Sequence, residues 1–340
     1  MAKVLVTGAN GFAGRSICKV LALHGYQVYA LVRKISVHTQ LFVNNPRITL
    51  LQGDLSSAEA LFDLLEKNEI EHVIHSAAVV SDWGPKEIFY EVNVNGTRRL
   101  LEASRLAAIK NFLYISTIDV LDYKHGKHTV LSETTPYTSS GHPYQKTKLL
   151  GELAAVDSRE YFKVVILRPA WLFGPGDKTL IPEIIHNLKQ GFLLLPGKKD
   201  TYIPLLYVEN FAFFVRNVLD RIDGLPSGTK MNLCDDAKIT WRQFVTFFKP
   251  ACNAKAVVVN IPYVLGYVAS LLFENYHRLL GIKTRPMITR SSLSMVTSSL
   301  EVDSSSMKQH LDNGFLSFEK AMDRTVAWFN INYCLRKEVH

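Results

Sequence analysis

Cysteine is scarce in this chain, and its four copies lie far apart. They are Cys18, Cys234, Cys252 and Cys334, and no two form the Cys-x-x-Cys pair typical of metal or redox sites. The spacing therefore predicts neither a metal centre nor a set of disulfides. The first residues lead directly into a predicted strand, without the charged and then apolar segment of a secretory signal. We therefore expect a cytoplasmic location, in a reducing compartment.

Long runs of one charge are also missing, although the chain as a whole is basic. Its 340 residues include 39 Lys and Arg against 31 Asp and Glu, which gives a net charge of +8. No Lys/Arg run and no alternation of basic and aromatic residues accompanies that charge. The balance therefore favours an anionic cofactor, with an acidic membrane surface as a further partner, over nucleic acid.

The longest charge-free segment of interest is too short to cross a bilayer, which takes about 20 residues. Residues 261–273 carry no charge, but the segment has only 13 residues, and Glu274, His277 and Arg278 follow it. One interpretation is a buried or lid helix in a substrate domain. The alternative is an interfacial helix, with peripheral membrane contact through residues 261–280 and access for an apolar substrate.

Glycines cluster directly after the first predicted strand. Residues 3–6 are typical of a short buried strand, and Gly8, Gly11 and Gly14 follow at the spacing Gly-x-x-Gly-x-x-Gly before a helical pattern. Such a strand–turn–helix presents backbone N–H groups where a pyrophosphate can bind, and side chains in the turn would clash. A tight turn that binds nothing is the alternative, but a βαβ pattern follows. We therefore predict dinucleotide binding.

The end of the second predicted strand indicates which dinucleotide is bound. A site for NAD usually has an Asp or Glu there, which binds the ribose 2′-hydroxyl. This chain has Arg33 and Lys34 instead. Cations at this place suit a 2′-phosphate, because a guanidinium pairs with phosphate oxygens. We expect NADP(H) to be preferred over NAD(H); the alternative is that both cations are ordinary solvated loop residues.

Predicted strands and helices alternate through the first half of the chain, which is typical of a doubly wound parallel sheet. The expected strands are residues 26–32, 48–51, 72–75, 112–116 and 164–167. The expected helices begin at Ser56, with a capping box to Glu59, at residue 87 up to about 108, and at Pro143 up to about 159. Residues 205–219 are predicted to form a strand and a helix that return to the sheet.

These patterns predict an α/β fold with two parts. The first is a Rossmann domain with a doubly wound parallel sheet, formed by residues 1–170 and a returning segment of about 203–230. The second is a smaller, mostly helical C-terminal domain of residues 171–202 and 231–340, which we expect to bind the substrate.

A Tyr-x-x-x-Lys pattern places a tyrosine and a lysine on one face of a predicted helix. Tyr144 and Lys148 open the helix that begins at Pro143. A lysine cation beside the phenol favours the phenolate and so lowers a tyrosine pKa from about 10, which suits an acid or base near neutral pH. The same pattern at residues 123–127 and 333–337 lies in a predicted loop and in the C-terminal tail.

Two hydroxyl side chains, Ser116 and Thr117, end the strand that precedes this helix. Open α/β sheets place ligands at this carboxyl edge. A hydroxyl there can donate a hydrogen bond to a substrate oxygen. The alternative is a hydroxyl that satisfies its own backbone.

The ordered set of motifs resembles the extended short-chain dehydrogenase/reductases of the NAD-dependent epimerase/dehydratase superfamily. The set also includes Asp54-Leu55, His75-Ser76-Ala77-Ala78, residues 93–97, Arg168-Pro169 and residues 174–177. Residues 81–85, Ser-Asp-Trp-Gly-Pro, resemble the 3β-hydroxysteroid dehydrogenase-like branch, which includes sterol dehydrogenases and bacterial reductases of long-chain 3-keto acids. The resemblance covers nearly the whole chain.

The resemblance implies a role for individual residues. Tyr144 would be the general acid/base, and Lys148 would bind the nicotinamide ribose and adjust the pKa of Tyr144. Thr117, with its neighbour Ser116, would polarise the substrate oxygen. Asn93 would help to order the active site. The cofactor-binding residues are then Gly8, Asn10, Gly11, Phe12, Gly14, Arg33, Lys34, Asp54, Leu55, Ala77, Ala78, Tyr144 and Lys148.

One departure from the family bears on the substrate. Many members that act on nucleotide sugars have an Arg-Asp pair before a Tyr-Val strand, and the arginine binds the substrate diphosphate. Residues 202–208 here are Tyr-Ile-Pro-Leu-Leu-Tyr-Val, without that cation. Because a buried anion without a partner is costly, we expect a hydrophobic substrate.

The favoured function is therefore an NADP(H)-dependent oxidoreductase that interconverts a ketone and a secondary alcohol. Its substrate would be steroid-like, a long-chain 3-keto compound or a secondary metabolite. One alternative is a nucleotide-sugar epimerase or dehydratase with a tightly bound cofactor. Another is a dinucleotide-sensing regulator without catalysis, although such proteins typically lose the tyrosine. Family analogy also suggests a homodimer.

Overall fold

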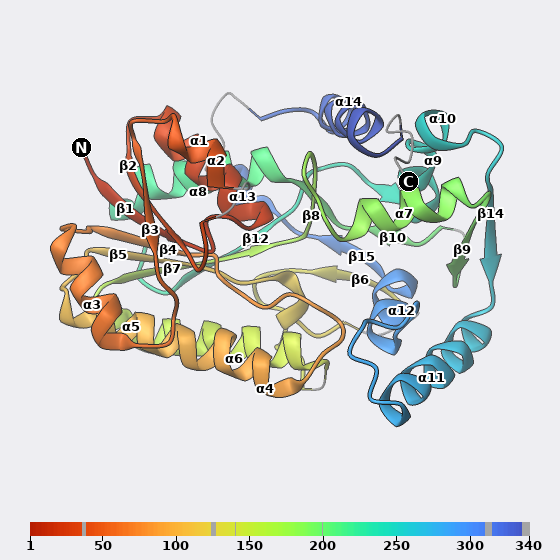
Figure 1. Ribbon diagram of the computed structural model, residues 1–340, viewed down its shortest axis with the longest axis horizontal. Coiled ribbons are helices and arrows are strands. Elements are labelled where there is room, and N and C mark those ends of the chain that lie inside the picture. The colour runs from red at the N-terminus through yellow and green to blue at the C-terminus, as the bar shows by residue number, and fades with distance from the viewer. Residues whose placement is uncertain (36–38, 124–126, 140, 199, 310–314, 335–340) are drawn as a thin grey trace.

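A parallel sheet of seven strands forms the centre of the molecule in the computed structural model (Figure 1). The structure describes residues 1–35, 39–123, 127–139, 141–198, 200–309 and 315–334. The strand order is β12-β7-β5-β4-β1-β2-β3, with every neighbouring pair parallel. The strands are β1 (Lys3–Thr7), β2 (Gln27–Val32), β3 (Ile48–Gln52), β4 (His72–His75), β5 (Asn111–Ile115), β7 (Lys163–Pro169) and β12 (Thr229–Leu233). The predicted doubly wound Rossmann fold is confirmed.

Helices cover both faces of this sheet (Figure 1). Alternate residues of one strand point to opposite faces, so Val4 and Val6 of β1 join one core cluster and Leu5 joins the other. The first face carries α1 (Phe12–Leu23), α2 (Gln40–Val43), α8 (Val208–Asp220) and α13 (Ser305–Lys308). The second carries α3 (Ala58–Lys67), α4 (Lys86–Tyr90), the π-helical turn η2 (Glu91–Gly96), α5 (Thr97–Leu106), α6 (Pro143–Asp157) and η4 (Ser158–Glu160).

The remaining elements lie beyond one end of the sheet, to the right in Figure 1. Four short strand pairs build this part: β8 (Trp171–Phe173) with β11 (Leu205–Tyr207), β9 (Phe192–Pro196) with β14 (Val257–Ile261), β10 (Tyr202–Ile203) with β13 (Ile239–Thr240), and β6 (His128–Leu131) with β15 (Ser299–Val302). The helical elements are α7 (Leu180–Lys189), α9 (Trp241–Thr246), α10 (Lys249–Cys252), α11 (Tyr263–Leu279), α12 (Arg290–Thr297), α14 (Phe318–Phe329) and η6 (Asn330–Cys334). The short helix η5 (Ile222–Gly224) instead follows α8 and lies beside the start of β7, where Lys163 Nζ donates to the Ile222 carbonyl at 3.0 Å.

Three local predictions need correction. The helix α3 is capped by Ser57, whose hydroxyl accepts from the Ala60 N–H at 3.2 Å, and not by Ser56. The predicted helix from residue 87 to about 108 begins at Lys86, contains the π-helical turn η2, and ends at Leu106. The strand predicted within residues 205–219 is β11, which pairs with β8 outside the central sheet.

The strand that does return to the central sheet is β12, which pairs with β7 and continues beyond the boundary predicted near residue 230. The helix α8 between β11 and β12 packs against α1 on one face of the sheet. Two other Tyr-x-x-x-Lys patterns occur in the sequence, at residues 123–127 and 333–337. The structure describes Lys127 of the first pattern, whereas Lys337 of the second lies outside the described residues.

A buried ion pair fastens α6 to the strand β7. The Arg168 guanidinium donates to the Glu152 carboxylate with Nη2–Oε1 at 2.5 Å and Nε–Oε2 at 3.2 Å, and both side chains are at most 1% exposed. The carboxylate also accepts from Tyr137 at 2.9 Å and from Ser116 at 2.6 Å. Removing one partner of such a pair leaves an uncompensated buried charge.

We expect Arg168→Met to destabilise the protein by about 3–5 kcal/mol, because Glu152 loses its buried cation. The measurement is the free energy of unfolding from urea denaturation. Arg105→Met is the matched control, because its partner Glu102 is 47% exposed and such surface pairs are worth about 1 kcal/mol or less. Equal losses in the two variants would contradict this account.

Candidate active site

The glycine-rich turn packs directly against the loop that follows β4. Gly8 has a φ of +65°, and a Cβ on it would lie 2.7 Å from the Ala77 Cα. A Cβ on Gly14 would lie 2.2 Å from the Gly8 carbonyl oxygen. Both positions therefore need glycine, and the turn between β1 and α1 lies beside the predicted cofactor channel at Ala77 and Ala78.

The start of α1 fits a pyrophosphate. Gly11 is the N-cap and no side chain caps it, and the first turn of the helix has no acidic residue. Gly11 is exposed, while Asn10 and Phe12 on either side are half-buried. The first N–H groups of a helix are electropositive and favour an anion. The residues predicted to hold the pyrophosphate are thus brought together at one helix end.

The residues predicted to bind the adenosine half lie at the ends of β2 and β3. Arg33 and Lys34 are exposed just after β2, and Asp54 is exposed after β3. Hydrogen bonds from Ser56, together with the charge of Arg33, lower the pKa of Asp54. A cavity of about 240 Å³ beside Asp54 is lined also by Leu31 and Gly53. Leu55 packs instead on Gly96 of η2.

A buried histidine links three elements beneath the site. His75, at the end of β4, contacts the Thr7 hydroxyl at 2.7 Å through Nδ1 and the Thr97 hydroxyl at 2.9 Å through Nε2. The Thr7 hydroxyl also accepts from the Ala77 N–H at 3.2 Å. Burial lowers the pKa of His75 to about 3, so the ring is neutral. The sequence motif contained His75 but gave no reason for it; its role here is to fix β1, β4 and α5 relative to one another.

Asn93 joins the same loop to the helix of the predicted acid/base. Its side chain accepts from the Val79 N–H at 2.8 Å and donates to the Val79 carbonyl at 3.1 Å and to the Thr147 hydroxyl at 3.1 Å. Thr147 lies on α6 between Tyr144 and Lys148. Asn93 therefore connects the loop after β4 to α6 through three hydrogen bonds, which is how it could order the site.

The capping of α6 fixes the position of Tyr144 in its first turn. His142 accepts from the Tyr144 N–H through Nδ1 at 3.3 Å, Gln145 accepts from the His142 N–H at 3.0 Å, and Pro143 is the first helical residue. Tyr144 is half-buried, and the Thr117 hydroxyl is near enough to lower its pKa against the effect of burial. Two of the predicted catalytic residues thus lie near each other.

The tuning of Tyr144 differs from the prediction. Lys148 is buried, its Nζ donates to the Ile115 carbonyl at 2.6 Å, and it lies 4.2 Å from the centre of the Tyr114 ring. Burial lowers the pKa of Lys148 to about 7. Burial and then the Asp119 carboxylate raise the pKa of Tyr144, against the hydrogen bond to Thr117. The predicted lowering by Lys148 is wrong here, because that amine is engaged elsewhere and has itself lost much of its charge.

The two predicted hydroxyls have different partners. Ser116 donates to Glu152 at 2.6 Å, as part of the buried ion pair with Arg168. Thr117 donates to Asp119 at 3.1 Å and lowers the pKa of Tyr144. Thr117 is therefore the hydroxyl nearer in effect to Tyr144, whereas Ser116 is bonded within the core.

Asp119 is a residue that the sequence interpretation missed. It lies in the short helix η3 (Ile118–Val120) after β5 and is buried. Besides Thr117, its carboxylate accepts from the Tyr123 hydroxyl at 3.3 Å and from the Trp171 indole at 3.4 Å. In the sequence, Asp119 is marked only as a carboxylate two residues after the hydroxyl that ends a strand. That spacing does not distinguish a buried carboxylate from one in an exposed loop.

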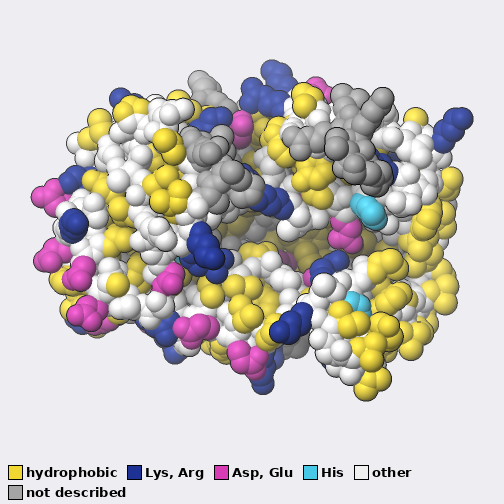
Figure 2. All heavy atoms as spheres, viewed as in Figure 1, with side chains coloured by type: hydrophobic (Ala, Val, Ile, Leu, Met, Phe, Trp, Pro, Cys, Tyr) yellow, Lys and Arg dark blue, Asp and Glu magenta, His cyan; other side chains and the backbone are white. Residues whose placement is uncertain are grey.

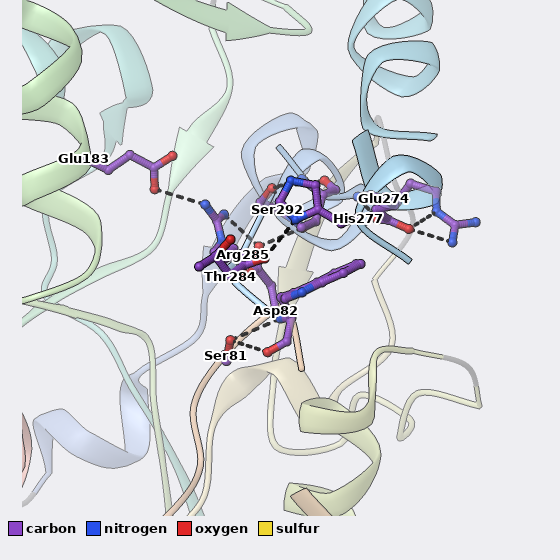
Figure 3. Close-up of polar contacts among 11 residues, drawn as sticks. Ser81, Asp82, Glu183, Glu274, His277, Thr284, Arg285 and Ser292 are labelled. Carbon is purple, nitrogen blue, oxygen red and sulfur yellow. Dashed lines mark hydrogen bonds and ion pairs between the residues drawn. The ribbon is translucent and has the colours of Figure 1, made fainter. Parts of the chain in front are cut away.

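Ion pairs tie the loop after β4 to the C-terminal part of the chain. Asp82 binds Arg285 through two oxygens, at 2.5 and 2.7 Å, and accepts from the Thr289 hydroxyl at 2.7 Å. Figure 3 shows Arg285 between Asp82 and Glu183 of α7, whose carboxylate is 3.6 Å from the guanidinium. The Arg278 guanidinium lies 5.4 Å from the centre of the Trp83 ring. The branch motif at residues 81–85 thus holds α11 and α12 next to the site.

A model of the NAD dependent epimerase/dehydratase family matches residues 4–234. The chain belongs to this family, which confirms the resemblance seen in its motifs. It is therefore a member of an enzyme family of the oxidoreductase and epimerase type that uses a nicotinamide dinucleotide.

Individual relatives span most of the chain. The 2-alkyl-3-oxoalkanoate reductase of Shewanella oneidensis is 26% identical over 335 residues, which cover 95% of this chain and 85% of the relative. The decarboxylating sterol-4-alpha-carboxylate 3-dehydrogenase of Mus musculus is 27% identical over 297 residues, covering 84% and 77%. Among solved structures, the UDP-glucuronic acid 4-epimerase from Bacillus cereus in complex with NAD has a TM-score of 0.76 and 20% identity, and the likeness covers 97% of both chains. That likeness shows the fold.

Proposed function

We propose that this protein is an NADP(H)-dependent oxidoreductase that interconverts a ketone and a secondary alcohol on a hydrophobic substrate. The observation that carries the proposal is that Tyr144, in the first turn of α6, and Thr117, at the carboxyl end of β5, lie near enough for the Thr117 hydroxyl to lower the pKa of Tyr144 against the effect of burial. Two hydroxyls at one point can share a substrate oxygen, one as acid or base and the other as a hydrogen-bond donor.

The roles of the residues follow from their positions. The nicotinamide, when bound, supplies or accepts the hydride. Tyr144 donates a proton to the carbonyl oxygen during reduction, and Thr117 supports that oxygen. Asn93 keeps the loop of Ala77 and Ala78 at a fixed distance from the Tyr144 helix. A raised Tyr144 pKa keeps the phenol protonated at neutral pH, as a general acid requires.

The apolar nature of the substrate is supported by the segment before α8. Residues 203–208 are buried and carry no charge, so a diphosphate at this place would have no cation from them. The relatives named as acting on 2-alkyl-3-oxoalkanoates and sterols are consistent with this choice. The alternative of a nucleotide-sugar epimerase or dehydratase rests on likeness of fold.

We expect Tyr144→Phe to reduce turnover at least about 100-fold, because the proton donor is lost. Reduced-nicotinamide fluorescence should show cofactor affinity within about twofold of the original protein, since the aromatic ring remains. The assay follows oxidation of NADPH with a panel of hydrophobic ketones. Tyr161→Phe, at a 60% exposed position, is the matched control and should keep full turnover.

Retained turnover in Tyr144→Phe would refute the role of Tyr144. Conversion of a UDP-sugar without net oxidation of cofactor, together with no reduction of any ketone, would replace the proposal with the epimerase.

The preference for NADP(H) is supported by the two exposed cations after β2. The charge of Arg33 contributes to the lowered pKa of Asp54, which follows β3 where the adenosine is expected. Arg33 and Lys34 are exposed, and a 2′-phosphate could reach both of them.

We expect Arg33→Asp to weaken NADPH binding about 10- to 100-fold, the worth of one or two charge-assisted hydrogen bonds. Binding of NADH should change less than about threefold, because it has no 2′-phosphate. Fluorescence titration measures both. Lys67→Asp makes the same change of charge at the exposed end of α3 and serves as the control. Equal affinity of the original protein for NADH and NADPH would sink this preference.

The helix α11 supports peripheral contact with an anionic membrane surface. Its buried residues are Gly266, Ser270 and Glu274, while large apolar side chains face outward, among them Val264, Leu265, Leu272 and Leu279 at 60–86% exposure. Figure 2 shows this apolar surface over α11, continuing along β14. Within the part of the chain that the structure describes, no helix is long and apolar enough to span a bilayer.

Charge favours anionic lipid as the occupant of this surface. Glu274 is the only acidic residue of α11, and it is buried and paired with Arg290 at 2.8 Å and Arg278 at 3.3 Å. The exposed Lys283 and Lys255 flank the apolar residues along the chain. An apolar face flanked in the sequence by exposed cations suits a bilayer surface with acidic headgroups.

We expect the double variant Leu265→Glu/Leu272→Glu to lose at least tenfold in binding to phosphatidylglycerol vesicles, because burying an exposed leucine in the bilayer contributes about 1.5–3 kcal/mol. Vesicle co-sedimentation is the measurement, with phosphatidylcholine vesicles expected to bind more weakly. Leu23→Glu/Leu106→Glu changes two exposed leucines on α1 and α5 and should bind normally. No binding of the original protein, or its dimerisation through this face in light scattering, would overturn the membrane contact.

A further inference from the structure

Arg15 is a half-buried cation in the first turn of α1, directly after the glycine turn. Its backbone N–H donates to the Gly11 carbonyl at 3.1 Å, so Arg15 belongs to the helix end where the pyrophosphate is predicted to bind. Its side chain extends to the loop after β8, where Nη2 donates to the Gly176 carbonyl at 3.3 Å. Arg15 therefore joins the cofactor turn to a segment that lies 161 residues later in the chain.

The loop that binds Arg15 is held by its own hydrogen bonds and fits closely around the guanidinium. Gly176 has a φ of +87°, and a Cβ on it would lie 3.1 Å from the Arg15 Nη2. The buried Asp177 fixes the other side of the loop, because its carboxylate accepts from the Thr179 N–H at 2.8 Å and from the Ile181 N–H at 2.9 Å. The motif at residues 174–177 thus keeps the guanidinium within one side-chain length of the glycine turn.

The charge of Arg15 forms no ion pair with an Asp or Glu of the described residues, and its side-chain partner there is the neutral Gly176 carbonyl. By contrast, the guanidinium groups of Arg168 and Arg285 each bind a carboxylate. Burying a charge without a counter-charge is costly, and an arginine stays charged in proteins. Burial accordingly lowers the pKa of Arg15. An anion between Gly11 and Gly176 would offset this cost.

The direction of the Arg15 side chain indicates which half of a dinucleotide it faces. In the sheet, β1 lies between β2 and β4, and the adenosine is expected on the side of β2 and β3, where Arg33 and Asp54 follow the strands. Gly176 belongs to the chain that continues from β7 and β8, and β7 lies on the other side of β1. Arg15 therefore extends away from the adenosine side and toward the side where the nicotinamide has to lie.

We propose that Arg15 binds the phosphate on the nicotinamide side of the pyrophosphate, while the Gly176 carbonyl holds its guanidinium in place. The proposal rests on the dinucleotide binding that is part of the proposed function. A guanidinium has five N–H donors, so Arg15 can bind Gly176 and a phosphate oxygen at the same time. NADH and NADPH both carry this phosphate. Arg15 therefore supports affinity for either cofactor, whereas Arg33 acts on the choice between them.

Binding of three ligands tests this assignment without turnover. NADH, NADPH and adenosine 2′,5′-bisphosphate are titrated into the cofactor-free protein by calorimetry, and the last of them lacks the phosphate on the nicotinamide side. In Arg15→Met we expect the affinities for NADH and NADPH to fall by the same factor of about 10 to 100, the worth of one or two charge-assisted hydrogen bonds. The affinity for adenosine 2′,5′-bisphosphate should change less than about threefold.

Three further variants serve as controls. Arg33→Asp should give the complementary pattern, in which NADPH and adenosine 2′,5′-bisphosphate bind more weakly and NADH binds almost as before. Lys19→Met removes an exposed cation one turn later on α1 and should leave all three affinities within about twofold. Arg15→Lys keeps the charge without the planar fork and should recover part of the affinity for both dinucleotides.

A purely structural role of Arg15 predicts different results. If Arg15 only joined α1 to the loop at Gly176, Arg15→Met would lower the midpoint of thermal unfolding of the cofactor-free protein and weaken all three ligands alike, which would overturn the proposal. Unchanged affinities for NADH and NADPH in Arg15→Met would also overturn it, and the proposed function would stand. Failure of the original protein to bind either dinucleotide would overturn the proposed function and the role of Arg15 together.

Discussion

The site depends on the hydrogen bonds of one buried amide, Asn93. The cofactor channel at Ala77 and Ala78 belongs to the loop after β4, whereas Tyr144 belongs to α6, and the two segments are far apart in the sequence. Asn93 bonds to both Val79 N–H and Val79 C=O, and to Thr147 of α6. Without the amide, two backbone groups of a half-buried loop would lose their partners, at about 1–3 kcal/mol each.

The backbone around Asn93 is adapted to this task. Residues Glu91–Gly96 form a π-helical turn between α4 and α5, and such turns often occur at functional sites. The wider turn is closed on its other side by Thr97, which donates to the Asn93 carbonyl at 2.8 Å and contacts the neutral His75. The side-chain amide of Asn93 is therefore fixed by the loop and by α6, and its backbone carbonyl by Thr97, which in turn contacts the buried histidine. Small shifts of α5 would otherwise alter the distance between the cofactor channel and the acid.

Patterns of neighbouring residues were sufficient to predict the main strands and helices of the fold. They were insufficient for features that depend on contacts between residues far apart in the sequence. The strand His72–His75 and the glycine turn follow from apolar runs and glycine spacing, because both are local. The cap of α3 falls on Ser57 because Asp54 already accepts from the Ser56 N–H at 2.8 Å, which holds Ser56 in the preceding turn. The π-helical turn has no signal in the apolar pattern, since the helix continues on both sides. The place of β11 beside β8 depends on partners far apart in sequence.

The chemistry of the site divides in the same way. Spacing alone could place Tyr144 and Lys148 on one helix face, but not the direction in which Lys148 points. The buried Ile115 carbonyl and the Tyr114 ring decide that direction. Likewise, Ser116 and Thr117 are adjacent in sequence and could not be distinguished from it. In the structure Ser116 donates to Glu152 of the buried ion pair with Arg168, whereas Thr117 donates to Asp119.

The two interpretations of residues 261–273, a lid helix and an interfacial helix, are both compatible with their apolar composition. They differ in which side of the helix is buried. In α11 the small and polar residues face inward, and the large apolar residues face outward. The buried Glu274 is paired with Arg290 and Arg278, and a buried carboxylate without such partners would be costly. The same helix is held near the site through Trp83 and the Asp82–Arg285 pair (Figure 3). One loop is thus fixed by Asn93 at Val79 and by Arg285 at Asp82, so the apolar face and the candidate active site share a single connecting segment.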